Sequence, residues 1–222
     1  MPAVIAGLPM GKKSVRSPVM KPPCRFAACL SVLTWLGLSA AFADSWPRLR
    51  GENGAGVASG VVFPTEWKES DFRFEIDLPG IGNGSPAIWG DKIFLLAASE
   101  PAPVKKGKKA KEKNGAASSQ PQAWMPLCLS TKDGSVLWKQ EIEEGSFKGH
   151  RFNSPASTTP AVDDKRVIFT WGTKEKLTMI AFSHEGEKLW ESDLGPVKGG
   201  HGFAASPMLL GDLVILNNDQ EK

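Results

Sequence analysis

The sequence predicts an all-β protein built from repeated four-stranded antiparallel units. Three observations predict this class: one hairpin pattern recurs three times, a glycine–tryptophan pattern recurs twice, and no stretch has a helical period. The 23 glycines and 17 prolines among 222 residues suit a chain with many tight turns.

The first recurring pattern is a small residue followed by proline, an apolar strand, a turn and a second apolar strand. Two apolar runs that flank a short turn rich in Gly or Asp predict a β-hairpin. The three copies are "SPAIWGDKIFLLAA" (residues 85–98), "TPAVDDKRVIFTWGT" (159–173) and "SPMLLGDLVILNND" (206–219).

The second pattern is an apolar strand, a polar turn with a glycine, and then Leu-Trp with an alternating tail. It occurs in "LCLSTKDGSVLWKQEI" (127–142) and "MIAFSHEGEKLWESDL" (179–194). Tryptophan follows glycine by four positions in both copies. "FRFEIDLPG" (72–80) fits the same place, with Phe74 instead of tryptophan and with no preceding partner strand.

Together the two patterns give units of four short strands, the make-up of a propeller blade of roughly 40–50 residues. We expect a lead-in and outer strand at 44–80 and propeller repeats over 81–222, divided into blades at 81–142 and 150–194 and a partial blade at 206–222. Closed propellers need roughly 4–8 blades. The sequence therefore predicts an incomplete ring, either the N-terminal part of a longer protein or a truncated gene product.

One insertion interrupts the first predicted blade. Residues 101–122 hold six lysines and have no large apolar side chain after Val104. Such a segment buries too little apolar surface to offset the entropy of ordering, so we expect a mobile, solvated loop. A basic tail that touches a polyanion is the alternative.

The N-terminus has the pattern of an export signal over residues 1–43. "MKPPCR" (20–25) is positively charged, "FAACLSVLTWLGL" (26–38) is apolar, and "AFA" (41–43) is a small-x-small cleavage site. We expect an exported protein, periplasmic or extracellular, with no transmembrane segment once the signal is removed. An uncleaved anchor and a start at Met20 instead of Met1 stay open.

The charge of the mature chain argues against nucleic acid as a partner. The first 43 residues hold five basic residues and no acidic one, so 22 of the 27 basic residues stand against 24 acidic residues in the remainder, a net charge of −2. The only cysteine of that remainder is Cys128. It lies in an apolar run, and we expect a small buried side chain and no internal disulfide.

Several segments resemble the repeat family of pyrroloquinoline quinone (PQQ)-like β-propellers, in its secreted bacterial members. They are "LSTKDGSVLW" (129–138), "SWPRLRGENGAGVASG" (45–60), "FPTEW" (63–67), "NSPASTTPAV" (153–162) and "GGHGFAASPMLLGDLVILNND" (199–219). The resemblance implies structural, blade-docking roles for Gly134, Trp138, Gly186 and Trp190, with Phe74 in the tryptophan position of an earlier unit. The chain departs from the pattern at Ser130 and Ser183, where the family has an acidic residue.

The resemblance does not carry chemistry with it. The dehydrogenases that share this fold bind PQQ through a calcium ion held by carboxylate and amide groups, and no such set can be matched here. We predict no catalytic residue, no metal ligand and no cofactor. His150 and His201 each precede a small-residue–proline pattern, and with Asn153 they are candidates for loops on one face. They either line a binding surface or only bond to loop backbone.

These observations favour an exported, noncatalytic binding or scaffold module. It would bind a protein or a small ligand on one propeller face. A noncatalytic outer-membrane assembly lipoprotein with the same repeats is the nearest analogue. The first alternative is the N-terminal fragment of a PQQ-dependent dehydrogenase, with PQQ and calcium as cofactors. A further alternative is the sensor domain of a larger signalling protein.

Overall fold

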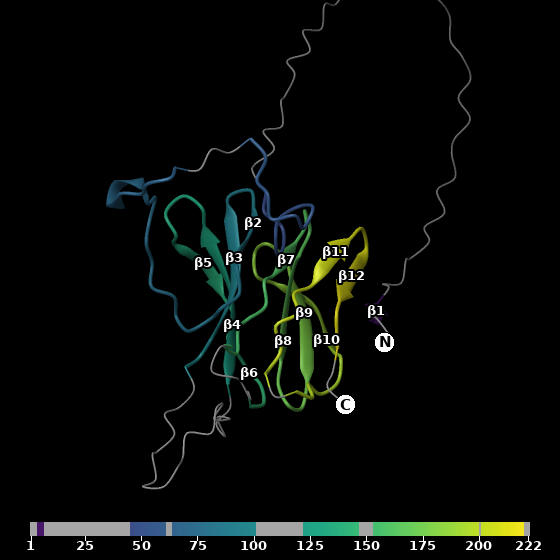
Figure 1. The fold of residues 1–222 in the computed structure, drawn as a ribbon. Helices are drawn as coiled ribbons and strands as arrows, with labels where there is room; N and C mark the ends of the chain where they lie inside the picture. Colours follow the sequence, from purple (N-terminus) through teal and green to yellow (C-terminus); the bar gives the residue numbers. More distant parts are fainter. Residues whose placement is uncertain are drawn as a thin grey trace, which may run out of the picture.

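The computed structural model confirms the predicted all-β class. It describes residues 4–6, 45–60, 64–100, 122–146, 153–199 and 201–219. These residues form antiparallel sheets and contain no α-helix, only one short 3-10 helix. Three sheets follow one another from the teal to the yellow part of the chain, and within the described ranges they do not close into a ring (Figure 1).

The first sheet is built from the two hairpins that the sequence predicts between residues 85 and 142. Its strands are β2 (Ala87–Trp89), β3 (Lys92–Ala98), β4 (Ala123–Ser130) and β5 (Val136–Lys139), paired in that order, with β6 (Ile142–Glu143) also paired to β4. Gly90 turns the chain between β2 and β3 with φ of 60°, where glycine is favoured. A register shift at Cys128 and Leu129 interrupts the β4–β5 pairing.

The second sheet repeats this arrangement. Its strands are β7 (Ala161–Val162), β8 (Val167–Gly172), β9 (Leu177–Phe182) and β10 (Lys188–Asp193), in the spatial order β10-β9-β8-β7. Every residue of β8 and β9 is buried, whereas no residue of β10 is fully buried. A strand that is buried on both faces reads as a continuous apolar run, which explains "VIFTWG" and "LTMIAF".

The third sheet holds the last predicted hairpin, β11 (Met208–Leu210) and β12 (Leu213–Leu216). The outer edge of β12 pairs with β1 (Val4–Ala6), a strand that the sequence did not predict. Alternate residues of the hairpin face opposite sides of this small sheet. Leu209, Val214 and Leu216 face the second sheet.

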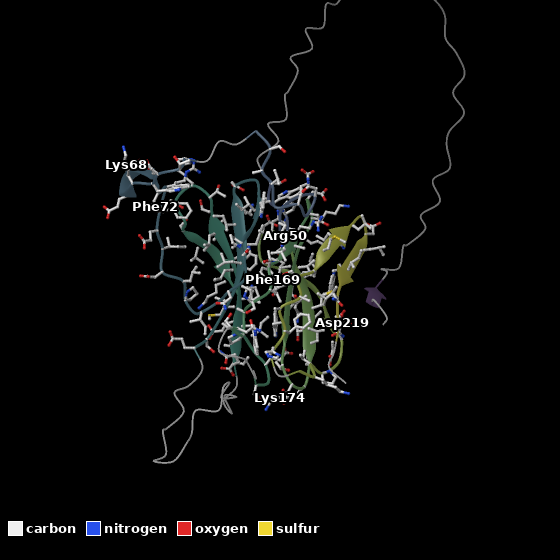
Figure 2. All side chains as sticks on the ribbon, in the orientation of Figure 1. Arg50, Lys68, Phe72, Phe169, Lys174 and Asp219 are labelled. Carbon is white, nitrogen blue, oxygen red and sulfur yellow. The ribbon has the colours of Figure 1, made fainter. Side chains whose placement is uncertain are left out.

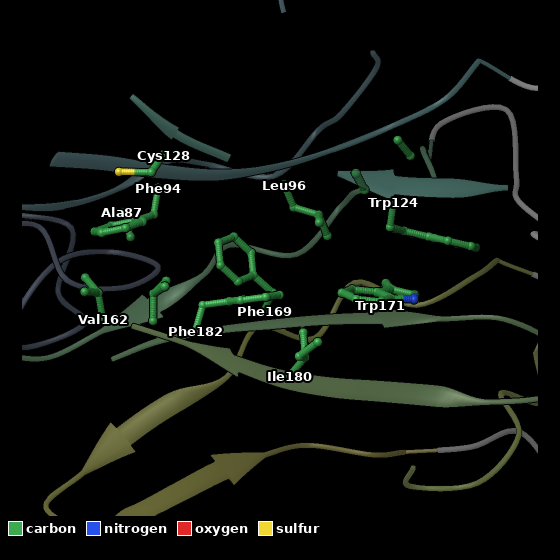
Figure 3. Packing of buried hydrophobic residues seen from close by; sticks show 13 residues of the cluster. Ala87, Phe94, Leu96, Trp124, Cys128, Val162, Phe169, Trp171, Ile180 and Phe182 are labelled. Carbon is green, nitrogen blue, oxygen red and sulfur yellow. The ribbon is translucent and has the colours of Figure 1, made fainter. Parts of the chain in front are cut away.

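The core lies between the sheets (Figure 3). Between the first and second sheets, the largest fully buried side chains are Trp124, Trp171, Phe94, Phe169 and Phe182. The rings of Trp124 and Trp171 stack with centroids 5.9 Å apart. Burial of each side chain of this size contributes roughly 1.5–3 kcal/mol, so stacking of sheets is the main source of stability.

The lead-in segment joins all three sheets. Trp46 exchanges two backbone hydrogen bonds of 2.9 Å with Ile88 of β2, and Pro47 O accepts a 2.8 Å bond from the backbone N of Val162 in β7. Arg48 Nη1 lies 3.1 Å from the sulfur of Met208 in β11. The lead-in therefore crosses the strands β2, β7 and β11, which start the three sheets.

The predicted outer strand at residues 72–80 is not a strand and pairs with none in the described part of the chain. Before it lies the 3-10 helix η1 (Glu69–Asp71), which projects from the side of the first sheet, and after it Ile81 forms a bridge with Ala98. Lys68 and Phe72 mark this projection, whereas Phe169 lies in the interior (Figure 2). An extended segment becomes a strand only when a partner strand is present.

Some predicted segments lie outside the described residues. They include the cleavage site and apolar run of the signal, residues 101–121 of the Lys-rich segment, and His150. Gln122, which the sequence assigned to that segment, instead belongs to the core, because its side chain is 1% exposed and Nε2 donates to Ser99 O. Among the described residues, no helix has the length and hydropathy to cross a membrane.

Candidate functional site

The contact between Trp138 of β5 and Gly186 of the β9–β10 turn joins the first sheet to the second. A Cβ placed on Gly186 would lie 2.9 Å from Cδ2 and Cγ of Trp138, closer than real Cβ atoms come. Gly186 also has φ of 88°, which strains any other residue. Glycine is therefore required here both by backbone conformation and by the indole that lies over it.

Polar groups fix the position of the same indole. Trp138 Nε1 donates to His184 O at 2.8 Å, and Gln140 Nε2 donates to Gly186 O at 2.9 Å. The ring also contacts Phe169 and Phe182 of the second sheet, with centroids 6.3 and 5.7 Å away. Trp138 thus belongs to one sheet by its backbone and to the next by its side chain.

Phe74 stands in the corresponding relation to Gly134. A Cβ on Gly134 would meet Phe74 Cδ2 at 2.7 Å and Ile76 Cγ2 at 2.8 Å, and Gly134 has φ of 74°. Arg73 Nη1 also donates to Thr131 O of the same turn. Residues 73–76 therefore occupy, against the first sheet, the place that the Trp138 strand occupies against the second.

Trp190 of β10 has the same sequence position as Trp138 but different neighbours. It packs at the edge of a cluster that includes Phe203, Val214 and Leu216. The described residues place no glycine turn against its ring. Sequence position alone predicts the role of Trp190 less well than that of Trp138, because the docking surface comes from another unit.

A partly buried carboxylate adds a polar connection between the first two sheets, and sequence reasoning missed it. Glu144 follows β6, and its Oε2 accepts 2.6 Å and 2.5 Å bonds from Trp171 Nε1 and Thr178 Oγ1. Its Oε1 lies 2.7 Å from Lys176 Nζ, which also contacts Glu191 at 2.6 Å. Only the position of Glu144 after the Leu-Trp tail could have drawn attention to it.

The charges of this network shift two pKa values in opposite directions. Burial lowers the pKa of Lys176, but the hydrogen bonds and charges of Glu144 and Glu191 outweigh it, so the pKa lies above its ordinary value. The hydrogen bond from Lys176 holds the pKa of Glu191 below its ordinary value. Both groups are therefore charged at neutral pH.

Two of the three proposed face residues come together. Asn153 Nδ2 donates to His201 O at 2.6 Å, while Asn153 Oδ1 accepts from Ser154 N at 3.0 Å and from the hydroxyl of Ser157. His201 is exposed, and Asn153 is partly buried. The loop before β7 and the loop before β11 thus meet through this hydrogen bond.

His184, in the turn between β9 and β10, is partly buried. Its ring lies 5.5 Å from that of Phe94 in the first sheet, and Nε2 is 2.7 Å from Asp163 O. The first sheet therefore partly covers this turn.

A hollow of about 330 Å³ lies at the end of the molecule formed by the β7–β8 and β11–β12 turns. Arg166 lines it, but its Nε already bonds Asp163 Oδ2 at 3.2 Å. The other lining residues are Pro47, Trp89, Val162, Asp164, Lys165, Leu209, Gly211 and Asp212. Asp163 lines the hollow as well, so three acidic and two basic side chains meet there, and no single ligand charge is favoured.

Cys128 is buried and is not a candidate nucleophile. Its side chain is 0% exposed, and burial raises the pKa of the thiol to about 12. The thiol therefore stays protonated and packs as a small apolar group.

A comparison with family models shows which known proteins part of the chain is similar to. Residues 126–222 match the family model described as "Outer membrane protein assembly factor BamB", which covers β4 to β12. These residues are similar to the PQQ-like repeat family. No curated protein matches the chain. The second sheet, with its turn glycine and Trp190, lies wholly within the matched residues, and the first sheet has the same strand order.

Within the described ranges no three His, Cys, Asp or Glu side chains are grouped as metal ligands. Asp163, which lines the hollow, forms an ion pair with Arg166 at 3.2 Å.

Proposed function

We propose that the protein is an exported, noncatalytic PQQ-like β-propeller module that binds or scaffolds other proteins. The observation that carries this proposal is the match of residues 126–222 to a family described as an outer membrane protein assembly factor. The proposed location is the periplasm or the cell exterior, because the N-terminal pattern is that of an export signal.

The packing supports a rigid module. Trp138 of the first sheet packs against Gly186 of the second. Glu144 connects the same two sheets by accepting hydrogen bonds from buried donors. Rigid sheets that present loops at one end are a common frame for recognition. We place the binding surface at the side where Asn153 meets His201.

A site-directed photo-crosslinker tests the proposed face. We expect benzoylphenylalanine at the exposed position 201 to capture protein in intact cells of the source organism. The same group at Leu189, which is 48% exposed on β10, is the matched control and should capture much less. Equal capture at both positions, or none at 201, would contradict the proposed face.

Reconstitution tests the noncatalytic part of the proposal. The purified protein, incubated with PQQ and Ca²⁺, should show no bound quinone absorbance and no dye reduction with alcohols or aldose sugars. Stoichiometric quinone binding with substrate-dependent dye reduction would favour the dehydrogenase alternative. We propose no cofactor for the protein itself.

A reporter fusion tests export. Residues 1–60 joined to alkaline phosphatase should give an enzyme that is active outside the cytoplasm. Deletion of residues 26–38 should abolish this activity, because the apolar region of the signal is removed. Activity that survives the deletion would contradict the proposed location.

A further inference from the structure

The residue before proline carries a hydroxyl in all three copies of the first recurring sequence pattern. These residues are Ser85, Thr159 and Ser206. Each lies in the loop that enters the first strand of its sheet, which is β2, β7 or β11. A residue that precedes proline is restricted mainly to extended conformations, so the proline limits the freedom of each of these hydroxyl-bearing residues.

The hydroxyls connect the loops of neighbouring sheets. The backbone N of Ser85 donates to Thr159 Oγ1 at 3.1 Å, and the backbone N of Thr159 donates to Ser206 Oγ at 2.9 Å. In both bonds the amide of one pre-proline residue meets the hydroxyl of the equivalent residue in the next sheet. The three loops are therefore joined in series by one repeated type of bond.

Thr159 is the joint between the two bonds. The residue is 2% exposed, and it uses its hydroxyl as an acceptor toward the first sheet and its amide as a donor toward the third. A buried polar group that loses its partner costs free energy. Thr159 is thus held from both sides, and a shift of its backbone disturbs both bonds.

Close backbone packing reinforces the connection between the first two loops. The backbone N atoms of Asn83 and Gly84 donate to Ala156 O at 2.9 and 3.1 Å. A Cβ on Gly84 would clash with Thr158 O, so the two loops approach more closely than a side chain would allow. These loops therefore have little room to move independently.

We propose that Ser85, Thr159 and Ser206 form a hydroxyl relay that couples the loop segments 80–86, 153–160 and 201–207 into one body, with Thr159 as its positioning residue. A displacement of one segment is transmitted to the other two, because the backbone of Thr159 takes part in both bonds. This coupling is independent of any partner that binds to the loops. It explains why each recurring pattern starts with a hydroxyl before proline.

Amide hydrogen exchange of the full chain, resolved by NMR, tests the relay. Ser206→Ala removes the acceptor of the Thr159 amide but leaves Thr159 Oγ1, the acceptor of the Ser85 amide, in place. We expect exchange to become roughly tenfold faster at both amides, the size of effect that the loss of one hydrogen bond produces. Faster exchange at Thr159 alone would overturn the proposal, because the loops would then be joined only in pairs.

Variants of two adjacent threonines complete the test. Thr159→Val should speed exchange at Ser85, and Thr159→Ser, which keeps the hydroxyl, should restore the wild-type rate. Thr158→Val is the matched control, because Thr158 is also 2% exposed but donates to Thr170 O within its own sheet. It should leave exchange at Ser85 unchanged.

The amides of β9 serve as the reference, since the core of a sheet reports global opening. They should keep wild-type rates in the relay variants. Equal acceleration at β9 and Ser85 would mean a loss of global stability instead of a broken relay. That result, acceleration by Thr158→Val, or failure of Thr159→Ser to restore the rate would each refute the relay.

Discussion

The indole of Trp138 lies over Gly186 at a distance that leaves no room for a Cβ, although the two residues belong to different sheets. This contact and the Glu144 network join the first and second sheets in addition to the apolar core between them. The stability of the two sheets should therefore be coupled at a few positions that can be tested one by one.

Gly186→Ala should lower the free energy of unfolding by about 3 kcal/mol. About 1–2 kcal/mol comes from left-handed backbone, and the remainder comes from displacement of the indole. Gly90→Ala is the control, because Gly90 has φ of 60° but open space around its Cβ position. Urea unfolding should show a smaller loss for Gly90→Ala, and equal losses would show that the indole contact contributes nothing.

Glu144→Ala should lower the free energy of unfolding by about 2–4 kcal/mol, since it leaves the buried donors Trp171 Nε1 and Thr178 Oγ1 without an acceptor. Glu144→Gln keeps an acceptor oxygen and should cost about 1 kcal/mol. Equilibrium unfolding of both variants at one pH separates the contribution of the hydrogen bonds to stability from that of the carboxylate charge. A larger loss for Gln than for Ala would refute the described role of the oxygen.

Glu191 should contribute to stability on the acid side. Its pKa is held below the ordinary 4.5 in the folded protein, so the stabilisation is present above that value and is lost as pH falls through the folded pKa. The side chain is 33% exposed, and the effect should be small. Unfolding free energies measured from pH 6 to pH 3 should fall less steeply for Glu191→Gln than for the wild type, whereas parallel curves would contradict this.

Cys128 should react with iodoacetamide only when the protein unfolds. Its thiol is buried and its pKa is about 12, so the thiolate is scarce at pH 8. The measurement uses the variant Cys24→Ser/Cys29→Ser and follows alkylation against urea concentration by mass spectrometry. Alkylation in native buffer at the rate of a free thiol would contradict the packing of β4.

Local pattern predicted most of the sheets. The turns at Gly90 and Gly211 and the alternation around them were sufficient for the hairpins, since these depend on neighbours in sequence. The place of Trp138 over Gly186 followed only from the family resemblance, because it joins residues of different units. Glu144 was missed, since its donors Trp171 and Thr178 lie on strands that no local pattern brings near it. Residues 72–80 read as a strand but have no partner among the described residues.

The lead-in has a consequence for the order of folding. Arg48 reaches Met208 across a sequence separation of 160 residues, and Trp46 and Pro47 reach β2 and β7. The residues that leave the ribosome early must wait for the last sheet before their contacts are complete. Such high contact order slows folding, so the first sheets form before the segment that joins all three is held in place.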